Sequence, residues 1–92
     1  MPVTLRLPAV LAKAAGGQTV HQAKGATVGE IVADVAARYP EVGTRLRDGK
    51  GEPYPYVIFY LDDEDIRFKK GFQTPVADGA DIVVVPAIAG GL

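Results

Sequence analysis

Residues 27–40 read TVGEIVADVAARYP and predict the one long helix of the chain. Thr27 and Glu30 have the spacing of a capping box, in which the threonine hydroxyl accepts from the Glu30 amide and the Glu30 carboxylate reaches back to the Thr27 amide. Asp34 and Arg38 lie four residues apart on the polar side and can form an ion pair. The final proline ends the helix. Apolar residues recur at the spacing of one helical face, at Val28, Ile31, Val32, Val35, Ala36 and Tyr39.

Strands are predicted on both sides of this helix. Val3, Leu5 and Leu7 alternate with Thr4 and Arg6, a pattern typical of a half-buried strand. Residues 18–23 are expected to pair with it as a hairpin. The intervening residues 9–17 are ambiguous, because a helix-forming run there is broken by two glycines.

The second half of the chain predicts a return hairpin. Residues 56–61 and 82–85 read as strands that are apolar on both faces. Residues 62–64 predict a turn, and residues 65–68 a short return strand. Residues 43–55 are rich in glycine and proline and predict a mobile loop.

This order of elements predicts one fold. One amphipathic helix can cover only one face of one sheet. A hairpin, a crossover helix and a return hairpin then give an α+β fold of the β-grasp (ubiquitin-like) type, a mixed sheet with one main helix packed across one face. We expect a single domain at residues 1–87 and a flexible C-terminal tail at residues 88–92.

The strand pattern also bears on function. A sheet that is covered on one face should show polar residues on the other, yet the two later strands are apolar on both. Part of the open face is therefore expected to be hydrophobic. Either loops cover these strands or the face is a docking patch for a partner, and we favour docking because the one obvious helix is already used.

The chain closes on two glycines before its last residue. Residues 82–92 read IVVVPAIAGGL. Two glycines make a poor structural terminus, because glycine loses the most backbone entropy when it is ordered. They can thread into a narrow slot and present a bare carboxylate to another protein. Leu92 follows them and would cover the carboxylate of Gly91, so the tail reads as a reactive end in a capped form.

Composition excludes several classes of function. The 92 residues carry a net charge of −1 and give no basic field for nucleic acid or for an anionic membrane. No stretch is long and apolar enough to span a bilayer, and a cytoplasmic location is the default. The chain has no cysteine, no serine and one histidine, so no Ser-His or Cys-His nucleophile can be assembled and no catalytic residue is expected.

Other polar clusters are interpreted as structural. The run from Asp62 to Asp65 lacks the glycine kink of a cation loop and predicts a solvated hairpin turn, with contact to a basic partner groove as the alternative. His21 has no second ligand nearby, so no metal site is expected. Lys69 and Lys70 read as a solvated turn. Tyr54, Tyr56 and Tyr60 are expected to pack or to contact a partner.

A family resemblance rests on the last third of the chain and extends over nearly all of it. The Asp78–Gly79 turn, the β-run after it, a proline and the terminal Gly-Gly resemble the end of the MoaD/ThiS sulfur carriers. The remainder is similar to the CysO-type carriers of cysteine biosynthesis. It shares Val3-Thr4 with Pro8, Gly16-Gly17-Gln18, the Thr27 helix and the segment from Asp62 to Phe68.

The resemblance implies a carrier rather than an enzyme. In this family an adenylyltransferase of the ubiquitin-activating type uses ATP to adenylate the terminal glycine, and a sulfur donor then displaces AMP to leave a thiocarboxylate. By position, Gly91 would be adenylated and thiolated, Gly90 would be the spacer, and Ala89 and Ile88 would complete the tail. Val85, six residues before Gly91, matches a hydrophobic docking position, and Val83 would share it. ATP would be used by the partner, with no cofactor bound to the carrier.

The last residue departs from the family pattern, since most carriers end at the second glycine. Some members carry a short extension that a JAMM-type zinc metallopeptidase removes, which would cut between Gly91 and Leu92. A residue left from a cloning site is the alternative origin of Leu92. In either case, the form with Leu92 is expected to be inert towards adenylation.

Three roles are compatible with the resemblance. The first is a dissociable carrier that delivers sulfur to a synthase of cysteine, thiamine-type or natural-product biosynthesis. The second is the small subunit of a molybdopterin-synthase-like complex, in which the tail stays inserted in a catalytic partner. The third is a ubiquitin-like modifier of protein lysines.

Overall fold

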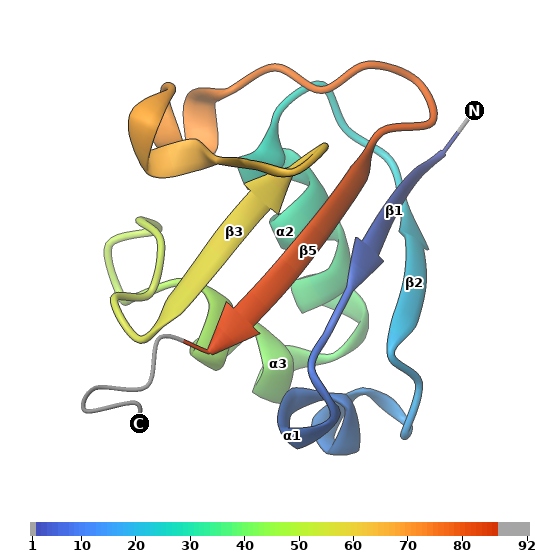
Figure 1. Ribbon diagram of the computed structural model, residues 1–92. Coiled ribbons are helices and arrows are strands. Elements are labelled where there is room, and N and C mark those ends of the chain that lie inside the picture. The colour runs from blue at the N-terminus through green and yellow to red at the C-terminus, as the bar shows by residue number, and fades with distance from the viewer. Residues whose placement is uncertain (1, 87–92) are drawn as a thin grey trace.

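A computed structural model describes residues 2–86 and shows a mixed sheet of five strands in the order β2-β1-β5-β3-β4 (Figure 1). β1 and β5 run parallel, and all other neighbouring strands are antiparallel. The predicted β-grasp arrangement is confirmed. The strands are β1 (Val3–Arg6), β2 (Val20–Ala23), β3 (Val57–Leu61), β4 (Glu64–Asp65) and β5 (Asp81–Pro86).

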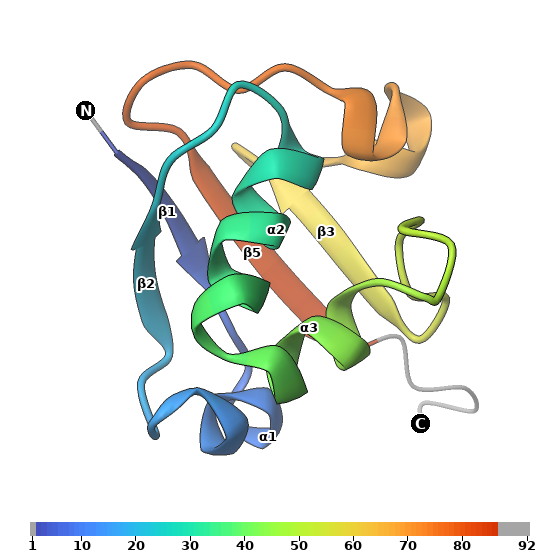
Figure 2. The ribbon, with the colours of Figure 1, turned by 180° about the vertical axis from the view of Figure 1, so that it is seen from behind.

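One helix crosses the sheet, as the sequence predicts. Seen from behind, α2 (Val28–Arg38) lies diagonally across β1, β5 and β3 (Figure 2). α3 (Pro40–Leu46) extends this layer, and α1 (Ala9–Ala12) lies at the end of the sheet where β5 stops. Three 3₁₀ turns complete the fold: η1 (Lys13–Ala15), η2 (Ile66–Phe68) and η3 (Gly71–Gln73).

The start of α2 is fixed by side-chain capping. The hydroxyl of Thr27 accepts from the Glu30 amide at 3.2 Å, as predicted. The Glu30 carboxylate, however, accepts from the amide of Ala26 at 2.9 Å and not from that of Thr27. The prediction of a capping box is therefore correct for the threonine and wrong by one residue for the glutamate.

The polar side of α2 ties the helix to the edge strand β2. The Arg38 guanidinium and the Asp34 carboxylate form an ion pair with 3.8 Å between nitrogen and oxygen, as the i, i+4 spacing predicts. Both also contact the backbone near β2. Asp34 accepts from the Lys24 amide at 2.9 Å, and Arg38 donates to the Gln22 carbonyl at 2.6 Å. These contacts hold the helix in register with the sheet.

The core lies between α2 and the covered face of the sheet. Every apolar residue of the predicted helical face is buried except Tyr39, which is half-buried. On the sheet side, alternate residues of three strands point into the same layer. They are Val3 and Leu5 of β1, Val57, Phe59 and Leu61 of β3, and Ile82 and Val84 of β5.

Two predictions about the second half of the chain are wrong. Residues 43–46, predicted as part of a mobile loop, belong to α3, because Pro40 ends α2 and also begins a new helix at its first position. Gly43 serves close packing there, since a Cβ on it would lie 2.6 Å from the Cβ of Ala36. The predicted return strand at 65–68 is strand only at Asp65, whose carboxylate accepts from the Arg67 amide at 2.9 Å and starts the turn η2.

Candidate functional site

The predicted reactive residues lie outside the described part of the chain. Ile88, Ala89, Gly90, Gly91 and Leu92 all follow Pro86, the last described residue. Pro86 ends β5, which is the middle strand of the sheet and pairs with β1 and β3. The structure therefore shows the surface around Pro86, the residue after which the tail begins.

The open face of the sheet carries an apolar patch next to this exit. Ile82 and Val84 are buried under α2, whereas Val83 is half-buried and Val85 is 36% exposed. β3 supplies the direct neighbours, because Ile58 pairs with Val85 and Tyr60 with Val83. Figure 1 views the sheet from this side, with no helix in front of it. We call these four residues, Ile58, Tyr60, Val83 and Val85, the open-face patch.

Charged pairs border the open-face patch on both sides. Arg6 of β1 is paired with Val83 of β5, and its Nε donates to the Asp81 carboxylate at 2.9 Å. On the other side, Arg67 forms a forked contact with Asp65, with distances of 2.9 and 2.7 Å to one carboxylate oxygen. Hydrogen bonds from Arg67 hold the pKa of the Asp65 carboxyl below its ordinary value, and Asp65 raises the pKa of Arg67. The Asp65–Arg67 pair therefore remains ionised at neutral pH.

An exposed aromatic ring projects from the turn beside β3. Phe68 ends η2 and is 86% exposed. The turn that carries it is braced by the Asp65–Arg67 pair and by a 2.7 Å contact between Lys69 and Glu64. The strand predicted for this segment gave no indication of an exposed aromatic ring on a braced turn.

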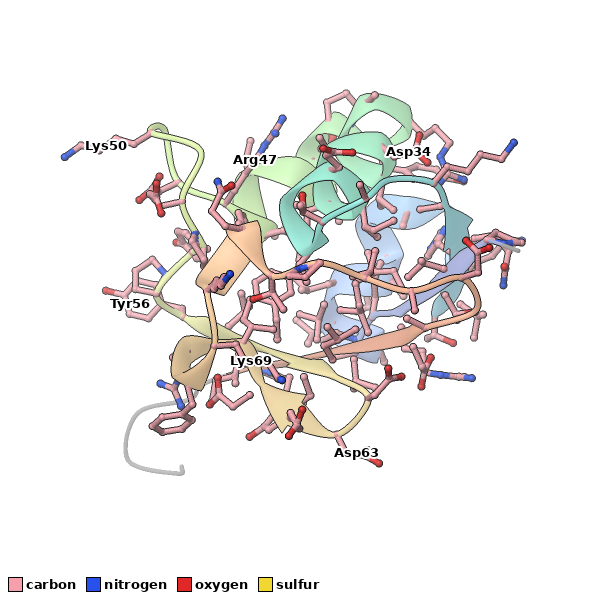
Figure 3. The ribbon with its side chains drawn as sticks, turned by 90° about the horizontal axis from the view of Figure 1, so that it is seen from above. Asp34, Arg47, Lys50, Tyr56, Asp63 and Lys69 are labelled. Atoms are coloured by element: carbon pink, nitrogen blue, oxygen red, sulfur yellow. The ribbon has the colours of Figure 1, made fainter. Side chains whose placement is uncertain are left out.

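The acidic run is a hairpin turn, as interpreted. Asp62 and Asp63 have φ values of 48° and 72°, the pattern of a tight two-residue hairpin turn. Asp62 accepts from the Asp81 amide at 3.0 Å. Figure 3 shows Asp63 at the tip of the turn, away from the helices. Within residues 2–86, no cluster of three metal-binding side chains is found.

The single histidine packs as a structural residue. His21 is buried, with Nε2 2.7 Å from the Gln18 carbonyl and its ring edge-on to Tyr39. Tyr54 and Tyr56 also meet edge to face. Among the described helices, none has the length and hydropathy needed to cross a membrane.

A small hollow that the sequence does not predict lies beside Pro86, where the described chain ends. It has a volume of about 160 Å³ and is bordered by Pro86 and by residues of three segments that are distant in sequence. Only tertiary structure brings these segments together, so the sequence held no local signal for it. The lining residues are Val10, Leu11, Arg45, Tyr54, Tyr56, Val57 and Pro86.

Comparison with known proteins places this fold in a family. The model of the ThiS family matches residues 5–91, from β1 through both terminal glycines. The chain belongs to the ThiS family. The resemblance drawn from the sequence is thereby confirmed.

Individual proteins match the chain over nearly its whole length. The sulfur carrier protein CysO of Mycobacterium tuberculosis is 39% identical, over 99% of this chain and 100% of its own length. A chain in the crystal structure of the Amycolatopsis orientalis BexX/CysO complex is 38% identical with a TM-score of 0.89, over 97% of this chain and 99% of that one. SAMP1 from Haloferax volcanii superimposes with a TM-score of 0.82 over 99% of this chain and 100% of its own, but at 22% identity this likeness shows the fold alone.

Proposed function

We propose that this chain is a sulfur carrier protein, not an enzyme, whose working group is the carboxyl terminus of Gly91. The observation that carries the proposal is the ThiS family match, which continues through Gly91, together with 39% identity to a CysO sulfur carrier. The open-face patch beside the tail's exit supports it, because a carrier must be held by proteins that act on its end.

The chemistry follows from the nature of a carboxylate. A carboxylate is a poor electrophile, so ATP converts the Gly91 carboxylate to an acyl adenylate and releases pyrophosphate. Sulfide then attacks the same carbonyl carbon, and AMP leaves with the electrons of the broken C–O bond. The product is a C-terminal thiocarboxylate that can deliver sulfur to an acceptor. All atoms that react belong to backbone, which explains why glycine suits the last two positions.

The folded domain supplies the binding energy that the tail lacks. A partner that grips the open-face patch through Val85 and Val83 positions the Gly91 carboxylate in its nucleotide site. The partners of this cycle are a ubiquitin-activating-type adenylyltransferase and a sulfur-accepting synthase. The BexX/CysO complex of Amycolatopsis orientalis supports the idea that such a carrier acts bound to another protein. Cysteine biosynthesis, the process of the CysO type, is the acceptor pathway that we favour.

Leu92 is proposed to cap the reactive carboxylate. A chain that ends at Leu92 should be inert, because a branched side chain would occupy the slot that accepts glycine. A JAMM-type zinc peptidase would cut the Gly91–Leu92 bond with a metal-activated water as nucleophile.

The test compares three chains: one ending at Leu92, one ending at Gly91, and one ending at residue 91 with Gly91→Ala. ATP–pyrophosphate exchange is measured with the adenylyltransferase purified from the source cells. We expect exchange only with the chain that ends at Gly91, and equal thermal melts for all three. Exchange by the alanine variant at the normal rate would contradict the threading argument, and equal exchange by the Leu92 chain would show that Leu92 is no cap. Cleavage of Leu92 in native extract that stops when a chelator is added would identify a metallopeptidase.

A further inference from the structure

The exit of the tail is surrounded by exposed apolar side chains that the core does not use. Val10 at the start of α1 is 63% exposed, and Tyr56 just before β3 is 64% exposed. Both border the hollow of about 160 Å³ that also includes Pro86 and Arg45. Figures 1 and 2 show α1, α3 and the start of β3 meeting where β5 ends, and Figure 3 shows Tyr56 pointing outward from its segment. We call Val10, Arg45 and Tyr56 the exit collar.

The length of the tail limits how far a partner can stay from the exit collar. Gly91 follows Pro86 by five residues, and five extended residues span at most about 18 Å. A protein that holds the Gly91 carboxylate inside a nucleotide site therefore lies within about 18 Å of Pro86. The exit collar borders Pro86 and is within reach of such a protein.

We propose that the exit collar is a second contact surface for the activating enzyme and receives an apolar side chain from it. This inference rests on the proposed function. The hollow is of the size that accommodates one benzene-sized group, since an apolar cavity of about 150 Å³ binds benzene. Arg45 lies at its border and forms no ion pair with any residue in the described range 2–86, so an acidic residue of the enzyme can meet it.

The exit collar is separate from the open-face patch. The patch faces away from α2 on β3 and β5, whereas the exit collar is built from α1, α3 and the segment before β3 at the end of the sheet. An enzyme that uses both surfaces would hold the root of the tail from two directions. This would restrict the direction in which the tail enters the nucleotide site, which the open-face patch alone cannot do.

The test uses the chain that ends at Gly91 and the adenylyltransferase purified by its ATP–pyrophosphate exchange with that chain. The double variant Val10→Ser with Tyr56→Ser removes the apolar groups at exposed positions, so the thermal melt should stay within a few degrees. We expect it to raise the KM for the carrier about thirtyfold with kcat unchanged, the size of an interface hot spot. Arg45→Glu should raise KM as well, and less so at high salt.

Matched controls lie at the far edge of the sheet. Val20 on β2 is 45% exposed, and Val20→Ser likewise removes an exposed apolar side chain, but on a strand two positions away from β5 in the sheet. Lys24→Glu reverses a charge in the same region, and both controls should leave KM unchanged. An unchanged KM for the collar variants, or an equal rise in KM for Val20→Ser, would overturn the proposal that the exit collar contacts the activating enzyme. Absence of exchange with the unmodified chain would instead refute the proposed function.

Discussion

Two adjacent residues of β5 separate folding from binding. Val84 is 2% exposed and packs under α2, whereas Val85 is 36% exposed on the open-face patch. We expect Val85→Asp to leave the melting temperature nearly unchanged and to weaken binding to the activating enzyme by about 2 kcal/mol or more. Val84→Asp should instead lower the free energy of unfolding by about 3 kcal/mol or more, because it buries an unpaired charge.

Both variants are checked by thermal melts and by titration of the carrier against the enzyme. Unimpaired binding by Val85→Asp would show that the activating enzyme does not dock on the open-face patch. Unfolding of the domain by Val85→Asp would show that the Val85 side chain lies in the core and not on the open face.

The acidic turn stores backbone strain at Asp63 as well as at Asp62. Asp63 has a φ of 72°, which glycine adopts freely, and Asp63→Gly creates the Asp-Gly pair that such hairpin turns prefer. We expect a gain of about 0.5 kcal/mol and thus a rise of roughly 2–4 °C in melting temperature.

Asp62→Gly is the control for this change. It relieves φ at the neighbouring position but removes the carboxylate that accepts from the Asp81 amide at 3.0 Å. A greater gain from Asp62→Gly than from Asp63→Gly would show that the hydrogen bond contributes little.

Among the elements, α2 depends most on a local signal. Thr27→Ala removes the hydroxyl that accepts from the Glu30 amide, and such a loss costs about 1 kcal/mol. For a domain of this size the melting temperature should fall by roughly 4–8 °C. Thr44→Ala is the control, because its hydroxyl donates to the Glu41 carbonyl at the surface of α3 and starts no helix. Equal losses from both variants would mean that capping is not what Thr27 contributes.

Local signals also explain which elements the sequence could predict. The α2 helix has a cap, a periodic apolar face and a terminating proline within one stretch, and β1 has a strict alternation, so both are found where they are expected. α3 was missed because Gly43, which reads as a loop residue, is required by the close approach of Ala36. η2 was missed because one side-chain hydrogen bond from Asp65 turns the chain.

The candidate site divides in the same way. The docking positions of Val83 and Val85 come from the family resemblance, because a strand that is apolar on both faces has no alternation to decide which residues face outward; the structure places both residues on the open face. The exit collar joins α1, α3 and the segment before β3, and no spacing in the sequence relates them. The roles of Gly91 and of the other tail residues remain predictions that come from the family resemblance.

At the scale of the whole molecule, the folded domain is the part that partner proteins bind, and a few residues of backbone after it are the part that reacts. β5 lies in the middle of the sheet and is held by neighbours on both sides, so the tail begins from a fixed point. Two surfaces, the open-face patch and the exit collar, lie next to that point. In this account the fold performs no chemistry and provides the grip by which other proteins reach Gly91.

The most direct test of the central claim is the intact mass of the protein recovered from its native cells, after treatment with a thiol-alkylating reagent to trap a thiocarboxylate. We predict a chain that ends at Gly91, with a fraction carrying sulfur in place of one terminal oxygen and one alkyl group on that sulfur. A population that retains Leu92 throughout, or that ends at Gly91 with no trapped sulfur while its cells take up sulfur for biosynthesis, would contradict the account.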